Sequence, residues 1–194
     1  MKNSDQERTA LDELFVHAEL VARGQMASMG EILPAMVLKT SDNRYIDLEP
    51  GQLQTITQRG TLQETIRALC IEADVTASTM LLPNTLTAKD QEKQEVALIL
   101  GATKTLRQER AMPMMRSAQG QFLGFADTWP LPHSPEAEDF QNFISREEPT
   151  RAERLSARAT LSRAGMSISR PCERGHHAYR GRQAERDEAE EYCR

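Results

Sequence analysis

The sequence predicts an α+β fold in which two helices pack on one face of a mostly antiparallel sheet. Two segments carry apolar residues at the i, i+3, i+4 spacing of a helix that has one buried face. Shorter runs of strand-like composition are bounded by turn residues. These segments follow one another in the order helix, two strands, helix, four strands, which favours helices packed against a single sheet. We expect this domain to occupy residues 1–129 of the 194-residue chain.

The first predicted helix covers residues 4–24, with Ser4 and Glu7 placed to form a capping box at its start. One face of this helix is apolar and consists of Leu11, Leu14, Phe15, Ala18, Val21 and Ala22. A hairpin follows, with an apolar run over residues 32–38, a Ser-Asp-Asn turn and a second strand over residues 45–48.

The second predicted helix covers residues 61–74, with a capping box formed by Thr61 and Glu64. Its apolar face consists of Leu62, Ile66, Leu69, Cys70 and Ala73. This periodicity predicts that Cys70 is a core residue.

Four strand-like segments complete the domain, at residues 75–83, 94–106, 110–117 and 121–129. The sequence "SAQG" is a natural hairpin turn between the last two. Residues 96–100 are apolar on both faces, which is expected of a central strand that a helix covers on at least one side. We expect the core to contain Leu14, Phe15, Ile66, Leu69 and residues 96–100.

The fold is expected to end near Trp129, because three prolines follow within six residues. Residues 130–149 are then a linker that contains a short acidic helix, with Phe140, Phe143 and Ile144 available to dock on the domain. Residues 150–194 contain ten arginines and no lysine, carry little apolar sequence, and are expected to form a disordered tail.

The net charge of −5 is unevenly divided along the chain, with −8 before Thr150 and +3 from it onward. An acidic body disfavours nonspecific attachment to nucleic acid or to anionic lipid. Three irregularly spaced cysteines favour a reducing compartment, and the sequence contains neither a signal-peptide pattern nor an apolar run of about 20 residues. We therefore expect a soluble, cytoplasmic protein without a membrane partner.

The order of several segments resembles a loose family of small uncharacterised bacterial and phage proteins. The resemblance is carried by "HAELV", then "LPAMVLKTSDNRYIDLEP", then a helix leading to "STMLLPNTLTA", then "QEVALILG" and a two-strand ending. It covers about residues 10–130 and implies neither an activity nor any functional residue.

The chain lacks the sequence motifs of several enzyme classes. It contains no phosphate-binding glycine loop and no Gly-x-Ser-x-Gly elbow, and its core cysteine, Cys70, is not expected to be a nucleophile. His17 lies on the flank of the first helix, where Glu13 and Glu19 are the nearest acidic residues in sequence; a pair with Glu13 is favoured. His133 lies among the prolines and is expected to face solvent. We predict no cofactor, and the sequence leaves any catalytic residue unknown.

A metal site is arithmetically possible near the end of the chain, with Cys172, His176, His177 and Cys193 as ligands. The adjacent histidines cannot easily both face one ion, and no apolar residues flank the set to form a small core. The sequence therefore favours a tail without metal.

A cytoplasmic binding or accessory protein without catalytic activity is the function that these observations favour, and its partner could be another protein. One alternative is a small enzyme whose site is assembled from residues distant in sequence. Another is association with nucleic acid through the arginine-rich tail. The sequence leaves the oligomeric state open.

Overall fold

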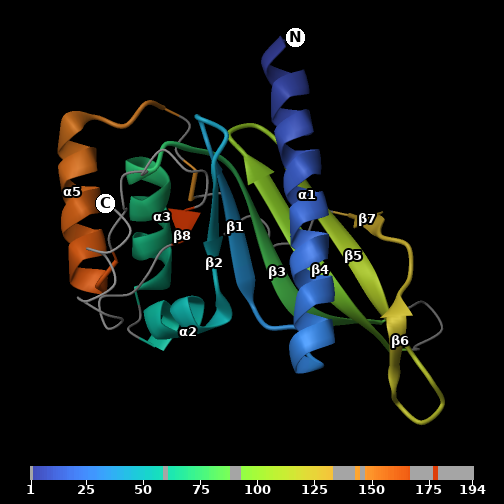
Figure 1. Cartoon of the computed structure of the whole chain (residues 1–194). Coiled ribbons are helices and arrows are strands. Elements are labelled where there is room, and N and C mark those ends of the chain that lie inside the picture. Colours follow the sequence, from blue (N-terminus) through green and yellow to red (C-terminus); the bar gives the residue numbers. More distant parts are fainter. Residues whose placement is uncertain are drawn as a thin grey trace, which may run out of the picture.

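The computed structural model describes residues 2–58, 61–87, 93–132, 143–144, 147–166 and 177–178. The predicted α+β class is confirmed, because these residues form four helices and a curled, mostly antiparallel sheet (Figure 1). The elements in chain order are α1 Lys2–Met29, β1 Ala35–Thr40, β2 Tyr45–Leu48, α2 Pro50–Gln58, α3 Leu62–Glu72, β3 Val75–Thr87, β4 Lys93–Thr103, β5 Arg107–Arg116, β6 Phe122–Phe125, β7 Trp129–Leu131, α5 Arg151–Ala164 and β8 His177–Ala178.

The sheet has the strand order β6-β5-β4-β3-β1-β2-β8, and β7 pairs with β5 beside β6. All of these pairs are antiparallel except the one between β2 and β8, which is parallel. The predicted hairpin turn between β5 and β6 is confirmed, because Ser117 and Gln121 are bonded across it and Gly120 has φ 81°. Glycine accepts this left-handed conformation without steric cost.

Helix α1 covers one face of the sheet. Leu11, Phe15, Ala18, Ala22 and Met26 of this helix form a buried cluster with alternate residues of four strands, namely Ala35, Leu81, Ala97, Ile99, Met112 and Met114. Leu14 packs beside them against Val37 and Ala77.

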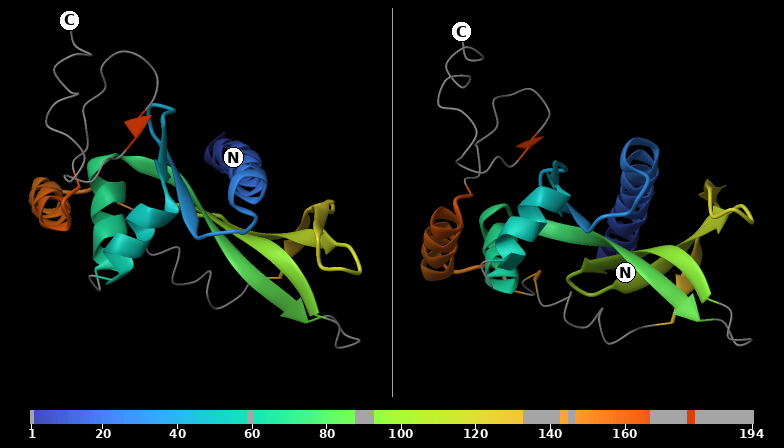
Figure 2. Two further views of the ribbon diagram at one scale, coloured as in Figure 1. Left: turned by 60° about the horizontal axis from the view of Figure 1, so that its bottom comes forward. Right: turned by 90° about the horizontal axis from the view of Figure 1, so that it is seen from below.

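The other face of the sheet is covered by α3 with α2 beside it, and α5 packs on the outer side of α3 (Figure 1). The intervening strand residues, such as Met36, Leu38 and Leu98, form a second cluster with Leu53 and Ile56 of α2, with Ile66 and Leu69 of α3, and with Ala157 and Leu161 of α5. In Figure 2, α1 lies on one side of the sheet and α3 on the other.

The prediction that both helices share one face is therefore wrong. Each residue of the predicted core is buried, but Leu14 and Phe15 lie on the opposite side of the sheet from Ile66 and Leu69. The physical reason is visible in β4, where every residue from Val96 to Thr103 is buried. A strand that is apolar on both faces needs cover on both.

Polar contacts hold α1 along the sheet. Glu7 accepts hydrogen bonds from the hydroxyls of Thr103 and Thr105, each at 2.6 Å, and Asp12 forms an ion pair of 2.5 Å with Arg110. The guanidinium of Arg110 lies 3.9 Å from the centroid of the Phe15 ring.

Helix α5 corrects the expected boundary of the tail. Thr150 and Glu153 form a capping box at its start, Gly165 ends it in the left-handed conformation, and Ala157, Leu161 and Met166 are buried. Residues 150–166 thus belong to the folded body, whereas residues 167–176 and 179–194 lie outside the described part of the chain.

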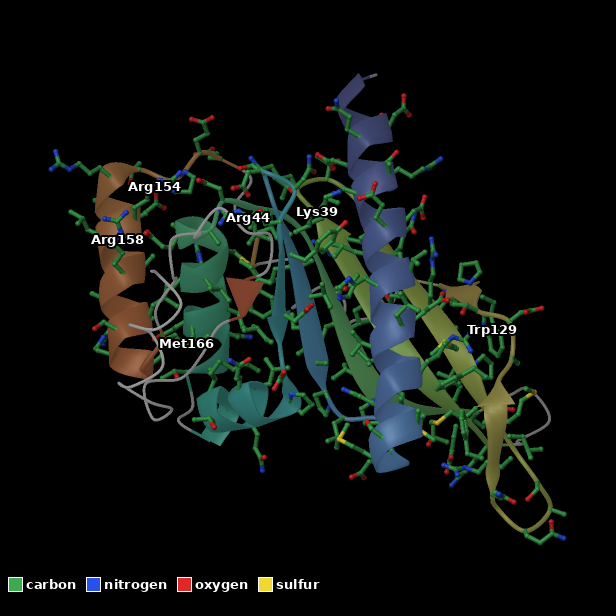
Figure 3. All side chains as sticks on the ribbon, viewed as in Figure 1. Lys39, Arg44, Trp129, Arg154, Arg158 and Met166 are labelled. Carbon is green, nitrogen blue, oxygen red and sulfur yellow. The ribbon has the colours of Figure 1, made fainter. Side chains whose placement is uncertain are left out.

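The arginines of α5 explain why the composition of this segment predicted a disordered tail although the segment is folded. Arg154 forms an ion pair of 2.7 Å with Asp74, and Arg158 forms one of 2.7 Å with Glu72, so α5 is joined to the end of α3 through charge as well as through its narrow apolar face (Figure 3). Among the arginines of α5, these two therefore form ion pairs with the end of α3 and the turn after it.

Several local predictions also differ from the structure. The sheet extends past the expected end at Trp129, because β7 continues to Leu131. Helix α1 begins before Ser4, and Thr61 makes no side-chain cap at α3, so neither predicted capping box is formed. In the predicted linker, Phe143 and Ile144 are docked in the core as expected, whereas Phe140 lies outside the described residues.

Candidate functional site

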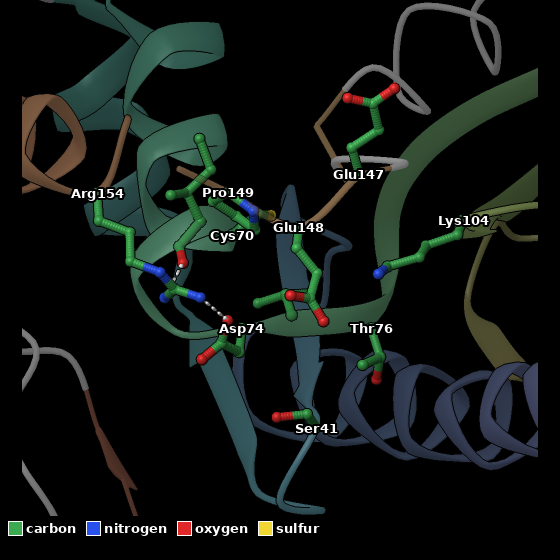
Figure 4. A pocket seen from close by; sticks show the side chains of 11 residues that line it. Ser41, Cys70, Asp74, Thr76, Lys104, Glu147, Glu148, Pro149 and Arg154 are labelled. Carbon is green, nitrogen blue, oxygen red and sulfur yellow. Dashed lines mark hydrogen bonds and ion pairs between the residues drawn. The ribbon is translucent and has the colours of Figure 1, made fainter. Parts of the chain in front are cut away.

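A polar cleft lies where α3 meets β3, beside the segment that leads into α5 (Figure 4). It has a volume of about 360 Å³. Five separate parts of the chain contribute its walls: the turn after β1, the end of α3 with the start of β3, the turn after β4, the segment before α5, and α5 itself. The lining residues are Ser41, Cys70, Ile71, Asp74, Val75, Thr76, Lys104, Glu147, Glu148, Pro149 and Arg154.

One ion pair fixes a wall of the cleft. Arg154 donates one hydrogen bond to the carbonyl oxygen of Ile71 at 3.2 Å and another to the carboxylate of Asp74 at 2.7 Å. The hydrogen bond with Asp74 raises the pKa of Arg154 above its ordinary value. Asp74 itself has φ 50° in the tight turn between α3 and β3, a conformation that aspartate tolerates better than most residues. The turn thereby presents its carboxylate to α5.

Two further charged side chains face each other across the cleft. Glu148 comes from the segment before α5 and Lys104 from the turn after β4, and Figure 4 shows both extending into the same space above Thr76. Glu147 points away from this space in the same view. The cleft therefore offers a cationic and an anionic group, with the hydroxyls of Ser41 and Thr76 nearby.

One lining residue of the cleft, Cys70, carries a buried thiol. Cys70 is 4% exposed, as its periodicity predicts, and burial raises its pKa to about 12. A thiol with this pKa is almost wholly protonated at neutral pH, and the thiolate is the nucleophilic form. None of the eleven described residues that line the cleft is a histidine. The described cleft residues therefore contain no pair of a histidine with a cysteine or serine nucleophile.

A second polar cluster joins α1 to the β1–β2 hairpin. His17 Nε2 lies 3.2 Å from the carboxylate of Asp47, and its ring stacks on Tyr45 with 5.3 Å between the ring centroids. Glu13 accepts hydrogen bonds from Lys39 and from the hydroxyl of Tyr45. The expected pair of His17 with Glu13 is wrong, because the hairpin supplies a different partner to each residue.

The remaining sequence candidates are not brought to the cleft by the described residues. Cys172, His176, Cys193 and His133 lie outside the described part of the chain, and for His177 only the backbone is described, in β8 beside β2. Within residues 2–58, 61–87, 93–132, 143–144, 147–166 and 177–178, no group of three histidine, cysteine, aspartate or glutamate side chains is arranged to hold a metal ion.

The cleft itself was missed at the sequence level. Its charged residues are separated by 30 residues between Asp74 and Lys104 and by a further 44 between Lys104 and Glu148, so no local motif marks them. The one available signal was Lys104, the last lysine of the chain, in a turn between two apolar strands.

Comparisons with protein-family models, with curated proteins and with solved structures find no match to this chain. None of the described helices is both long and apolar enough to cross a membrane.

Proposed function

We propose that the protein is a binding protein, and that the polar cleft takes a small zwitterionic ligand such as a free amino acid. The observation that carries this proposal is the convergence of Lys104 and Glu148 from separate segments on one cleft of about 360 Å³. A ligand with an ammonium and a carboxylate group complements this pair.

The arrangement of charges supports a zwitterion over a simple ion. Asp74 and Arg154 neutralise each other at 2.7 Å, so this pair serves as a fixed wall. Lys104 and Glu148 then provide opposite charges from opposite sides, with Lys104 facing the ligand carboxylate and Glu148 facing its ammonium group. The hydroxyl of Ser41 can donate a further hydrogen bond to the carboxylate, whereas the hydroxyl of Thr76 already donates to the carbonyl of Lys39 at 3.3 Å.

Binding without chemistry is favoured by the groups in the cleft. The thiol of Cys70 is held protonated by burial, and the hydroxyls of Ser41 and Thr76 have no histidine among the described lining residues to activate them. Hydroxyl nucleophiles need an adjacent base to react at neutral pH.

Calorimetric titration of the full chain with a panel of amino acids tests this proposal, alongside acetate and methylamine as ligands that carry one charge each. We expect at least one amino acid to bind, and neither single-charge compound to bind comparably. Lys104→Met and Glu148→Gln should each weaken binding roughly tenfold or more, which corresponds to about 1.4 kcal/mol.

Matched substitutions at exposed residues outside the cleft, Lys93→Met and Glu64→Gln, should leave the affinity unchanged. Equal losses in these controls, or an affinity that neither cleft substitution alters, would place the ligand elsewhere on the protein. If acetate binds as tightly as an amino acid, the cleft recognises only an anion, at Lys104, and the zwitterion proposal fails.

A further inference from the structure

The outer edge of β2 exposes main-chain hydrogen-bonding groups. In the β1–β2 hairpin, the N–H of Thr40 donates to the carbonyl of Arg44 at 3.0 Å. Because bonded and non-bonded pairs alternate along an antiparallel ladder, Ile46 and Leu48 bond toward β1, whereas Tyr45 and Asp47 direct their main-chain groups away from it. Two residues of β2 therefore point their donors and acceptors to the outside.

A short segment from the end of the chain occupies this edge. Strand β8 pairs with β2 in parallel, with His177 opposite Ile46 and Ala178 opposite Asp47. In a parallel pair of strands, a bonded residue forms its two main-chain hydrogen bonds with the residues before and after the one that lies opposite it. His177 is thus in register with the outward groups of Tyr45 and Asp47, and it directs its own N–H toward Tyr45.

The opposite edge of the sheet is protected against such pairing. It is formed by two separate strands, β6 and β7, and Pro130 at the centre of β7 has no N–H to donate. Between these strands the pairing with β5 is interrupted at residues 127–128, after the N–H of Ala126 has donated to the carbonyl of Pro113. Proline and interruptions of this kind are the usual protection of an edge strand. Of the two described edges, the one at β2 is the edge suited to a further strand.

We propose that the edge of β2 is a docking site for an extended peptide segment of a partner protein, which adds to the sheet in parallel, and that β8 holds this edge when the partner is absent. The two-residue length of β8 favours exchange, because a longer incoming strand forms more main-chain bonds than β8 does. This inference does not rest on the proposed ligand of the cleft.

The charge of the protein favours a basic partner segment. The sequence around β8, residues 170–182, contains four arginines and one glutamate, whereas the first 149 residues carry a net charge of −8. A basic strand is therefore attracted to the body as it approaches, and this attraction is screened by salt. We expect a partner segment to be extended and rich in arginine or lysine.

A fluorescent peptide with the sequence of residues 170–182, with serine in place of the cysteine, is a direct probe of this edge. Its binding to the full chain is measured by anisotropy. His177→Pro removes the N–H that faces Tyr45 and releases β8. Ala178→Pro is the matched control, because the N–H of Ala178 points away from β2 in this register.

We expect the peptide to bind the His177→Pro chain roughly tenfold more tightly than the wild-type chain, because an internal competitor lowers the apparent affinity by the fraction of open sites. The Ala178→Pro chain should resemble the wild type. A second measurement, amide hydrogen exchange at Asp47, should be slow in the wild-type chain and faster in the His177→Pro chain.

Three results would overturn the proposal. The first is no binding of the peptide by the His177→Pro chain. The second is an equal gain of affinity in the two proline variants. The third is a wild-type dimer that His177→Pro converts to a monomer, because a second copy of the chain, and not a partner protein, would then occupy the edge.

Discussion

His17 links α1 to the β1–β2 hairpin through its contact with Asp47. The hydrogen bond with Asp47 raises the pKa of His17 from 6.5, while partial burial opposes this shift. A histidine whose pKa is raised on folding stabilises the folded state fully below its unfolded pKa, and this contribution is lost as the pH rises through its folded pKa. Tyr45 stacks on the ring, and Glu13 precedes His17 by one turn of α1.

We predict that His17→Gln destabilises the protein more at pH 5.5 than at pH 8.5. The glutamine cannot carry the positive charge that Asp47 stabilises in the wild-type chain. Urea denaturation of both chains at the two pH values gives the difference in the free energy of unfolding. A difference of the same size at both pH values would show that packing of the ring, and not its charge, is what His17 contributes.

The contrast between Cys70 and His17 shows which residues could be placed from sequence. The burial of Cys70 follows from helical periodicity alone, because apolar residues recur along its own helix at the spacing of a buried face. His17 and Glu13 do not, since their partners Asp47 and Lys39 lie on strands whose register with α1 is not encoded locally. The charged pair of the cleft, Lys104 and Glu148, is beyond sequence reasoning for the same reason.

At the scale of elements, the closest approach of α1 to the sheet depends on Gly101 in β4. A Cβ atom at this position would lie 2.7 Å from Cζ of Phe15 and 2.8 Å from Cδ1 of Leu11, both fully buried side chains. The absence of a side chain therefore sets how near the helix lies to the strand.

We predict that Gly101→Ala costs about 1–3 kcal/mol, the usual range for overpacking a filled core. Gly24→Ala is the matched control, because Gly24 lies within α1 with nothing within 4 Å of the added Cβ. It should stabilise the protein by about 0.5–1 kcal/mol through helix propensity. Thermal and urea denaturation measure both changes, and a neutral Gly101→Ala would mean that α1 can shift without loss.

Strands and the long helices were the elements most open to prediction. Residues 45–48 form β2 as expected, and the apolar runs predicted strands that overlap β3, β4 and β5. Helix α2 was not among the predicted elements, although Leu53 and Ile56 are buried three residues apart. Helix α5 was missed because its buried stripe is narrow, with Ala157 and Leu161, while its arginines resemble those of a disordered tail.

For the whole molecule, the boundary of the folded body can be tested by truncation. We predict that a chain ending at Glu148 melts well below the full-length protein, because it loses Ala157, Leu161 and Met166 from the core and both ion pairs of α5. A chain ending at Met166 retains these contacts and loses only the pairing of β8 among the described elements.

Scanning calorimetry of the three chains measures the difference. The chain ending at Met166 should melt within a few degrees of the full-length protein, since removing two paired residues costs about 1.5 kcal/mol or less. Equal melting temperatures for all three chains would exclude α5 from the cooperative unit. A large fall on truncation at Met166 would instead give the last 28 residues a structural role.

The placement of α1 on the sheet also affects how the chain acquires its fold during synthesis. The helix is made before the sheet, but its buried face packs on Ala97, Ile99 and Gly101, about 80 residues later in the sequence. Contacts between such distant segments slow folding, and apolar surface that waits for its partner is prone to aggregation. Leu11 and Phe15 therefore lack their contacts with β4 until that strand has been synthesised, and this makes α1 a candidate binding segment for a molecular chaperone.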